Sequence, residues 1–223
     1  MTHVVHPYSS RLGIIRDWKS RWFGDKKNYR AYLKSDIFVR RFLEKELRGF
    51  FVSNIEIERG EKTLKVIIET SRPGMVIGRN GEGSANLKKK LEKDLIKRGL
   101  VFNQDLRLDI REVKSPESNS AIVAQMIAEG LEKRMPFRRV AKQMMEKVVA
   151  NRDVKGVKIL LSGRLGGADM ARKEKMKSGR IPLQTLRADV DFARQEARLP
   201  YGTIGIQVWI YKGDIFTEKQ RKQ

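Results

Sequence analysis

The sequence contains no cysteine and only two histidines among its 223 residues. Without cysteine there can be no disulfide framework, thiolate nucleophile or zinc finger. Both imidazoles, His3 and His6, fall in an exposed-looking N-terminal stretch, so no metal or cofactor is expected. No apolar run reaches the roughly 20 residues that cross a bilayer, and the apolar core of a signal peptide is missing. We therefore expect a soluble, cytoplasmic protein that does not contact a membrane.

Acidic residues are scarce relative to basic ones. The chain has 27 Asp and Glu against 48 Lys and Arg, which leaves a net charge of +21. A surplus of this size attracts polyphosphates regardless of their sequence and favours nucleic acid or an acidic membrane surface as the partner. The length allows one or two domains of ordinary size, each able to bury a core.

The apolar pattern predicts a compact α+β unit that ends near residue 114. A helix is expected from Ser35, with Ser35 or Asp36 as its cap, to about Gly49. Two alternating runs, Phe51–Arg59 and Thr63–Thr70, should pair as an antiparallel hairpin across Gly60 and Glu61. A helix over about Ser84–Arg98 and a strand over Asp105–Val113 complete the unit.

The polar segment Ser115–Ser118 predicts a domain boundary. Beyond it, helices are expected over about Asn119–Arg134 and Arg138–Asn151, with Pro136 forcing the break between them. The expected strands are Val157–Leu161, Thr185–Ala193 and Thr203–Trp209. This gives a basic arm over 1–16 that orders only against a partner, domains over 17–114 and 115–216, and a short tail over 217–223.

A Gly-x-x-Gly loop, Gly78-Arg79-Asn80-Gly81, precedes the lysine-rich helix of the first unit. Closely spaced glycines let main-chain N–H groups approach a phosphate, and a helix that follows adds its positive N-terminal end. A nucleotide P-loop would need Gly-Lys before Ser or Thr, but Gly83 meets Ser84 directly. A dinucleotide fingerprint would need a third glycine where Asn86 stands. A plain connecting turn is the remaining alternative.

A second basic cluster surrounds the Pro136 break. Its members are Lys133, Arg134, Arg138, Arg139 and Lys142. The last three share one flank of the expected helix, and only Glu132 and Glu146 are nearby carboxylates in the sequence. The cluster is either a solvated helix face or an RNA or DNA contact, and the strongly basic total favours contact.

Two further patterns have competing interpretations. Asp189 and Asp191 alternate on an expected strand and could serve acid–base chemistry, but Arg187 and Arg194 beside them and the lack of a third ligand favour a polar strand face. Gly163, Gly166 and Gly167 could cradle a phosphate or could form a tight crossing between elements.

Several motifs, taken together and in this order, resemble the bacterial family of small-subunit ribosomal protein three, whose N-terminal domain is a type II KH domain. They are Val5-His6-Pro7, Arg11-Leu12-Gly13, Arg72-Pro73-Gly74, Val76 to Gly81, Phe137-Arg138-Arg139, Ser162 to Ala168, Leu186 to Asp189 and Tyr201 to Gly213. The sequence departs from the family at Ser84, where relatives carry an aliphatic residue. That departure predicts a looser start to the helix.

The resemblance implies an α+β protein in which a type II KH domain precedes a C-terminal α/β domain with two helices on a small sheet. It implies binding to 16S-type ribosomal RNA in the head of the small subunit, beside small-subunit proteins ten and fourteen. It also implies a place at the entrance of the messenger channel, near proteins four and five, where the protein positions messenger RNA and passively assists its unwinding.

The predicted RNA contacts fall into three sets. The KH loop set is Gly78, Arg79, Asn80, Gly81, Lys88 and Lys89; the messenger set is Arg134, Arg138, Arg139 and Lys142; the ribosomal RNA set is Arg11, Arg16, Lys19, Arg164, Gly166, Gly167 and Arg172. We expect a structural protein without catalytic residues, enzymatic turnover or a small-molecule substrate. A free-standing KH-type regulatory RNA-binding protein is the alternative, and a phosphate-handling enzyme built on Asp189 and Asp191 is a weaker one.

Overall fold

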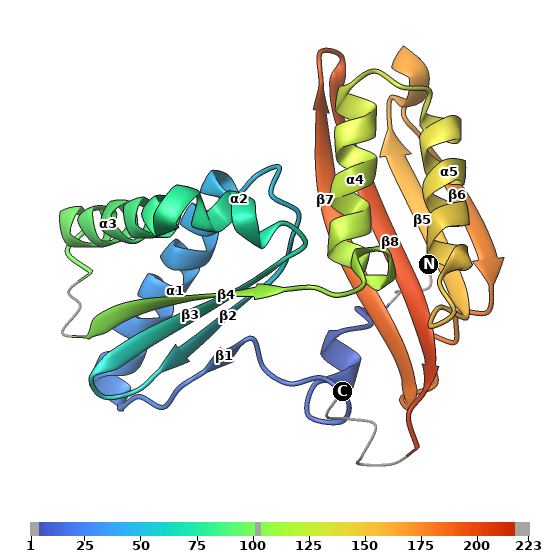
Figure 1. Cartoon of the computed structure of the whole chain (residues 1–223). Helices are drawn as coiled ribbons and strands as arrows, with labels where there is room; N and C mark the ends of the chain where they lie inside the picture. The colour runs from blue at the N-terminus through green and yellow to red at the C-terminus, as the bar shows by residue number, and fades with distance from the viewer. Residues whose placement is uncertain (1–4, 101–103, 217–223) are drawn as a thin grey trace. The chain divides into compact units, whose positions relative to one another are not determined.

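The computed structural model describes residues 5–100 and 104–216. The chain forms two compact units (Figure 1). The glycine-loop unit comprises Trp18–Lys114, and the two-helix unit combines Met1–Asp17 with Ser115–Gln223. The predicted tail over 217–223 lies outside the described residues.

The glycine-loop unit packs helices on a four-stranded sheet. The strands are β1 (Ser20–Arg21), β2 (Val52–Arg59), β3 (Thr63–Thr70) and β4 (Asp105–Glu112), in that spatial order. β2 and β3 form the expected antiparallel hairpin, while β3 and β4 are parallel. The parallel pair requires a helical crossover, which α2 (Pro73–Ile77) and α3 (Glu82–Lys97) supply. α1 (Lys26–Glu46) and α3 contribute Val39, Leu43, Leu87, Leu91 and Leu95 to the core.

The expected helix cap at Ser35 or Asp36 is wrong. α1 begins at Lys26, and both residues lie buried inside it. Asp36 accepts a hydrogen bond from the indole N–H of Trp22 at 2.7 Å and pairs with Arg59 at 3.0 Å. Asp36 therefore forms hydrogen bonds inside the unit and does not cap the helix. Because Ser and Asp are favoured at helix N-termini, the sequence alone suggests that the helix starts here.

The two-helix unit places two helices on one face of an antiparallel sheet, as Figure 1 shows. Its helices are α4 (Ser120–Glu132) and α5 (Phe137–Ala150), and its strands are β5 (Gly156–Gly163), β6 (Arg172–Gly179), β7 (Ala188–Leu199) and β8 (Gly202–Asp214). The spatial order is β6-β5-β8-β7. Ile127 of α4 and Val140 of α5 pack on Ile159 and Ile206 of the sheet. The α+β class and the pair of helices on a small sheet are as predicted.

Two strands and one helix escaped the sequence analysis. β6 reads Arg-Lys-Glu-Lys-Met-Lys-Ser-Gly, and of this strand only Met176 packs against the core, so no apolar alternation marks it. β1 is too short to show a pattern. α2, with only five residues, is too short to show a helical period, and it starts at Pro73 because proline is tolerated in the first turn of a helix.

The described part of the N-terminal arm, from Val5 to Asp17, packs against its own unit, whereas it was predicted to order only against a partner. Arg11 lies at the centre of this packing and is fully buried. Its guanidinium donates to the carbonyl oxygens of Ala188 at 2.6 Å, Pro7 at 2.9 Å and Thr185 at 3.0 Å. It also donates to Pro182 and Leu183 at 3.3 and 3.1 Å. One side chain therefore satisfies the carbonyl oxygens of the turn before β7 and holds the N-terminal arm against that turn.

Candidate nucleic-acid interface

The glycine loop has the backbone conformation that its glycines permit. Gly78 has φ +72° and Gly81 has φ +81°, both in the region that L side chains rarely adopt. Asn80 between them is also left-handed at φ 49°, which Asn tolerates better than most residues. The loop thus turns sharply from α2 into α3 and leaves Arg79 and Asn80 exposed at its tip.

The start of α3 is tight, so the looser start predicted from Ser84 is wrong. A Cβ on Gly83 would lie 2.7 Å from the carbonyl oxygen of Val76 and 2.9 Å from that of Ile77. The hydroxyl of Ser84 donates to the carbonyl of Gly81 at 2.8 Å and closes the first turn. The close approach of α2 and α3 at Gly83 fixes the loop without an aliphatic residue at position 84.

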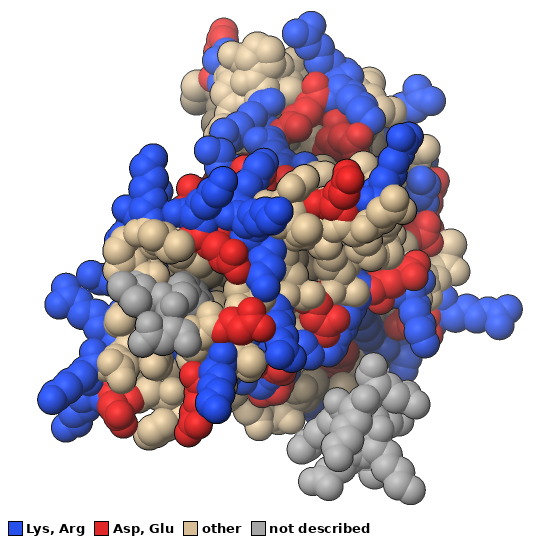
Figure 2. All heavy atoms as spheres, turned by 60° about the vertical axis from the view of Figure 1, so that its left-hand side comes forward, with Lys and Arg blue, Asp and Glu red and all other residues tan. Residues whose placement is uncertain are grey.

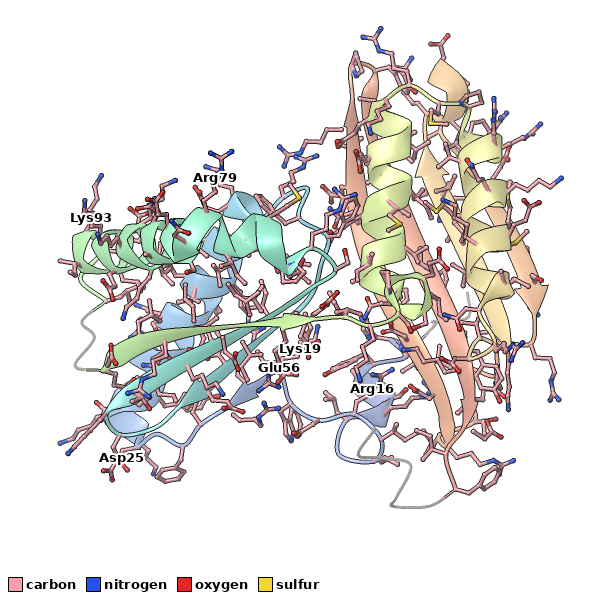
Figure 3. All side chains as sticks on the ribbon, viewed as in Figure 1. Arg16, Lys19, Asp25, Glu56, Arg79 and Lys93 are labelled. Atoms are coloured by element: carbon pink, nitrogen blue, oxygen red, sulfur yellow. The ribbon has the colours of Figure 1, made fainter. Side chains whose placement is uncertain are left out.

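The cations around the loop differ in their exposure and in whether they already pair with a carboxylate. Arg79 and Lys93 project outward from the loop and from α3 (Figure 3). Lys89, one helical turn before Lys93 in α3, is also exposed. Lys88 is half-buried and pairs with Asp105 at 3.3 Å, and together with Arg107 it lowers the pKa of that carboxyl. Lys and Arg side chains cover much of the face in Figure 2, interspersed with carboxylates. Of the predicted loop cations, Arg79 and Lys89 are therefore the more available.

The flank of α5 presents three of the four members of the predicted messenger set. Arg138, Arg139 and Lys142 are exposed, on the side away from the buried Val140. Arg138 pairs with Glu174 of β6, with its Nε at 3.2 Å and a terminal nitrogen at 3.0 Å. This contact raises the pKa of Arg138 and lowers that of Glu174. Glu174 was not expected as a neighbour of Arg138, because no apolar alternation in the sequence marks β6 as a strand.

Arg134 occupies a strained position between α4 and α5. Its φ is +60°, a left-handed conformation that ends helices and is usually taken by glycine. Its N–H donates to Leu131 at 2.9 Å, and the next N–H, of Met135, donates to Gly130 at 3.2 Å. An exposed arginine held in this conformation favours a role for its side chain outside the fold.

Replacing Arg134 by Gly is expected to raise the free energy of unfolding by about 1 kcal/mol, because the left-handed conformation costs a residue with a Cβ about that much. Lys133→Gly is the matched control, since Lys133 has a φ of −75° and gains nothing from glycine. Urea denaturation measures both. Equal destabilisation by the two variants would contradict the strain.

The predicted ribosomal RNA set differs in exposure and in the contacts that its side chains already make. Arg164 donates to Ala168 at 3.0 Å and Tyr201 at 3.3 Å and pairs with Asp169 at 2.9 Å, so it holds its own loop together. Gly166 and Gly167, with φ of +71° and +80°, are exposed in that loop. Arg172 is exposed and contacts Glu174 at 3.2 Å.

The N-terminal members of this set fare differently. Arg11 is enclosed, with its donors on backbone carbonyls, so its predicted role in RNA contact is wrong for this structure. Arg16 is half-buried against Asp189 at 2.6 Å. Lys19 is exposed and lies near Glu56 of β2 in Figure 3. Arginine type and position alone did not distinguish a buried carbonyl-binding role from a surface one.

Neither a catalytic pair nor a metal centre is found in the part of the chain that the structure describes. Asp189 is bound to Arg16, and Asp191 accepts the backbone N–H of Ser120 at 2.8 Å. The two carboxylates thus have separate structural partners. No cluster of three or more His, Cys, Asp or Glu could hold a metal among residues 5–100 and 104–216. No helix within these ranges is both long and apolar enough to span a membrane.

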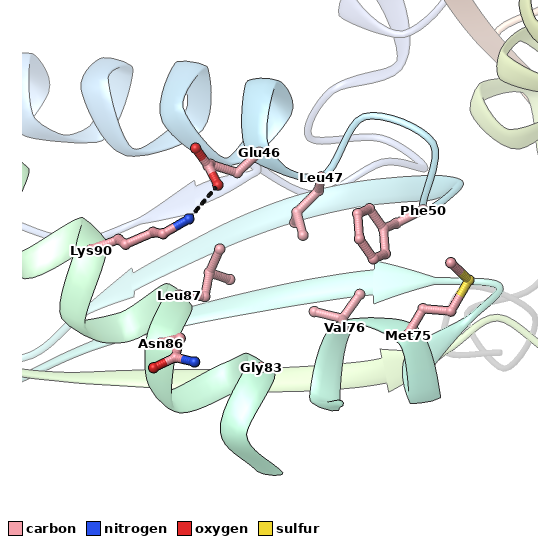
Figure 4. Close-up of a pocket in the computed structure, with 9 residues that line it drawn as sticks. All are labelled: Glu46, Leu47, Phe50, Met75, Val76, Gly83, Asn86, Leu87 and Lys90. Carbon is pink, nitrogen blue, oxygen red and sulfur yellow. Dashed lines mark hydrogen bonds and ion pairs between the residues drawn. The ribbon is translucent and has the colours of Figure 1, made fainter. Parts of the chain in front are cut away.

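A small apolar hollow lies on the α1 side of α3 (Figure 4). It is lined by Glu46, Leu47, Phe50, Met75, Val76, Gly83, Asn86, Leu87 and Lys90. The only charged side chains at it, Glu46 and Lys90, pair with each other at 3.3 Å. Such a hollow supplies neither a general acid–base pair nor a phosphate cradle.

Comparisons with known proteins agree with this picture. The family profile described as "KH domain" matches residues 39–118, and that of "Ribosomal protein S3, C-terminal domain" matches residues 127–210. A "Small ribosomal subunit protein uS3" of Caldicellulosiruptor bescii is 50% identical over 219 residues, which cover 98% of this chain and 96% of the relative. One from Clostridium botulinum (strain Okra / Type B1) is 44% identical over 220 residues, covering 99% and 96%.

The fold and its basic surfaces therefore define an RNA-binding protein with an N-terminal KH domain. More specifically, the chain belongs to the uS3 family of small ribosomal subunit proteins. This confirms the resemblance found in the sequence. Members of this family are structural proteins of the ribosome and not enzymes, which is the class that the sequence analysis predicted.

Proposed function

We propose that this protein binds 16S-type ribosomal RNA in the head of the small subunit, in the cytoplasm, and that α5 lines the entrance of the messenger channel. The family relationship supports the first part. The observation that carries the second is the flank of α5, where Arg139 and Lys142 are exposed and Arg138 is held by Glu174. A rigid helix positions these cations at fixed spacing, which suits contact with a phosphate backbone.

The contribution to messenger unwinding is passive in this proposal. Neither a nucleotide-binding motif nor a catalytic pair was found in the described residues, so the side chains of α5 act only by holding strands that have opened. The cations of α5 bind the phosphates of an opened messenger strand and so slow its re-pairing, while translocation by the ribosome supplies the work. Arg134 extends the same surface from the α4–α5 turn.

Protein neighbours are part of the same proposal. Small-subunit proteins ten and fourteen in the head, and four and five near the messenger entrance, are the neighbours that the family resemblance implies. An exposed apolar stripe on α1 supports a protein contact on the glycine-loop unit. Tyr29, Leu33 and Ile37 recur every four residues there and are 52%, 41% and 43% exposed.

Changing Arg138, Arg139 and Lys142 together to Ala is expected to flatten the salt dependence of messenger binding. Each single-strand phosphate contact contributes about 0.7 to the slope of log K against log salt, so the slope should fall by roughly 2. Small subunits reconstituted with the variant should translate an unstructured messenger normally and slow at a stable downstream hairpin.

If the salt slope and the rate of translation through the hairpin are both unchanged, the cations of α5 form only a solvated helix face and the proposed messenger contact is wrong. Glu146→Gln is a control on the same helix, because it alters an exposed charge without removing a cation. The free-standing regulatory alternative predicts instead tight, sequence-selective binding of short single strands that Gly78→Asp abolishes.

A further inference from the structure

The face of the two-helix unit's sheet that lies away from α4 and α5 carries a group of cations that were not predicted from the sequence. Val157, Ile159 and Leu161 of β5 pack under the helices, so Lys158 and Leu160 point to the opposite face. Lys158 is paired with Lys177 of β6, Leu160 with Lys175, and Ser162 with Lys173. Across the sheet, Gln207 of β8 is paired with both Leu160 and Arg194 of β7. We name Lys158, Lys173, Lys175, Lys177 and Arg194 the lysine face.

The opposite sides of β6 have different chemistry, which confirms this assignment. Glu174 and Met176 are half-buried, with Glu174 bound to Arg138 of α5 and Met176 packed against the core. The three lysines that alternate with them are exposed. β6 therefore turns its few core-facing groups toward the helices and all its lysines away.

The charge of the lysine face is not balanced within the unit. Within the described ranges, none of its five cations has a carboxylate at ion-pair distance, and Glu196, two residues beyond Arg194, is the acidic side chain on the same side of β7. Burial, Lys175 and Lys177 all lower the pKa of Lys158. Like charges on neighbouring strands destabilise a sheet, so an anionic partner would stabilise this arrangement.

Protection of a sheet edge is the other physical reason for lysines on β6. Edge strands carry lysine to prevent pairing with other chains, and β6 is an edge. That reason does not extend to Lys158, which lies half-buried on the inner strand β5. The extension of the lysine face from β6 to Lys158 of β5 is better explained by a surface that binds an anion.

The aromatic residues of this face are covered, which indicates the kind of anion. Trp209 is 4% exposed, and the Nζ of Lys158 lies 4.3 Å from its ring centre. The guanidinium of Arg194 lies 5.4 Å from the ring centre of Phe192. Sheets that read single-stranded RNA stack bases on open aromatic rings. This sheet presents ammonium groups instead, which suits a phosphate backbone.

We propose that the lysine face binds the sugar–phosphate backbone of helical ribosomal RNA, as an RNA contact separate from the KH loop and from α5. Alternate residues of a strand are about 6–7 Å apart along the backbone, so the three lysines leave β6 at a spacing comparable with that of successive phosphates on one strand. Contact with the backbone makes the surface indifferent to base sequence. This inference rests on the proposed function, since it assigns a surface to the same RNA partner.

The first test compares two triple variants of the full chain for binding to a mixed-sequence RNA duplex and to transcribed 16S-type ribosomal RNA. Lys173, Lys175 and Lys177 changed to Ala should lower the salt slope by roughly 2–3, at about 0.9 per duplex phosphate contact. The matched control changes Lys26, Lys27 and Lys34 of α1 to Ala, which removes the same charge from an exposed helix. Equal slopes for the two variants would overturn the proposal.

The second test locates the RNA. Because the chain has no cysteine, Lys175→Cys creates a single attachment point for an iron chelate that generates hydroxyl radicals. Cleavage of bound ribosomal RNA is expected from position 175, and little from a chelate on Lys27→Cys. Absence of cleavage from position 175 while the wild-type chain binds would refute the lysine face alone. Absence of binding by the wild-type chain would refute the proposed function.

An acidic protein segment is the competing occupant. Polyglutamate serves as the probe, measured against the RNA duplex at matched charge and salt. Preferential binding of polyglutamate that the β6 triple variant abolishes would overturn the RNA assignment. Preferential binding of the duplex supports it.

Discussion

Arg11→Ala is expected to lower the free energy of unfolding of the two-helix unit by about 3–5 kcal/mol, which would make it among the most damaging single changes in the chain. The side chain is fully buried, and its guanidinium donates to five backbone carbonyl oxygens from Pro7, Pro182, Leu183, Thr185 and Ala188. Alanine leaves these acceptors unpaired and opens a cavity. Both costs fall on the turn that leads into β7.

Tryptophan fluorescence can report this unit alone. Of the three tryptophans, only Trp209 lies in the two-helix unit, so a Trp18→Phe, Trp22→Phe background isolates its signal during urea denaturation. Arg11→Lys should be intermediate, because an ammonium has three donors where the guanidinium has five. Arg16→Ala, which breaks a partly exposed pair with Asp189, should cost about 1 kcal/mol or less. A midpoint for Arg11→Ala equal to that of Arg16→Ala would contradict the structural role.

Gly83→Ala is expected to destabilise the glycine-loop unit by about 2–4 kcal/mol and to weaken RNA binding through the loop. The added Cβ would meet the carbonyl oxygens of Val76 and Ile77 at 2.7 and 2.9 Å, and both are backbone atoms that cannot rotate away. α2 and α3 must then separate. The turn through Gly78, whose own Cβ position lies 2.9 Å from the Gly83 nitrogen, would change with them.

Gly74→Ala is the matched control for this prediction. Gly74 lies in α2, and nothing lies within 4 Å of an added Cβ there. Alanine has the higher helix propensity, so this variant should be neutral or more stable by about 0.5–1 kcal/mol. Denaturation followed by the fluorescence of Trp18 and Trp22, both in the glycine-loop unit, in a Trp209→Phe background measures both variants. Similar midpoints for the two would refute the close approach of α2 and α3 at Gly83.

Periodicity predicted the elements that bury an apolar stripe. The hairpin of β2 and β3, the leucines of α3 and the two helices of the second unit were found because their core residues recur at the spacing of strands or helices. β6 was missed because its outward side is all lysine and its inward side holds one apolar residue. Without β6, neither the contact of Glu174 with Arg138 nor the lysine face could be predicted.

Sequence could not show which arginines face inward. Arg11, Arg16 and Arg164 read as surface cations, since nothing local marks a carbonyl cage or an ion pair formed by residues far apart in the chain. Arg139 and Lys142 were predicted to be exposed on one flank, and they are, because helical spacing alone places them opposite Val140. The sequence predicted which residues share a helix face, but it did not predict polar contacts between residues far apart in the chain.

In the function proposed above, the surplus of cations on both units is neutralised by RNA backbone. The salt dependence of wild-type binding to 16S-type ribosomal RNA tests it most directly, because log K falls with log salt in proportion to the phosphates contacted. We expect a linear fall with a slope of about −5 or steeper, as several phosphate contacts require. A slope near zero, or no binding at low salt, would contradict the account.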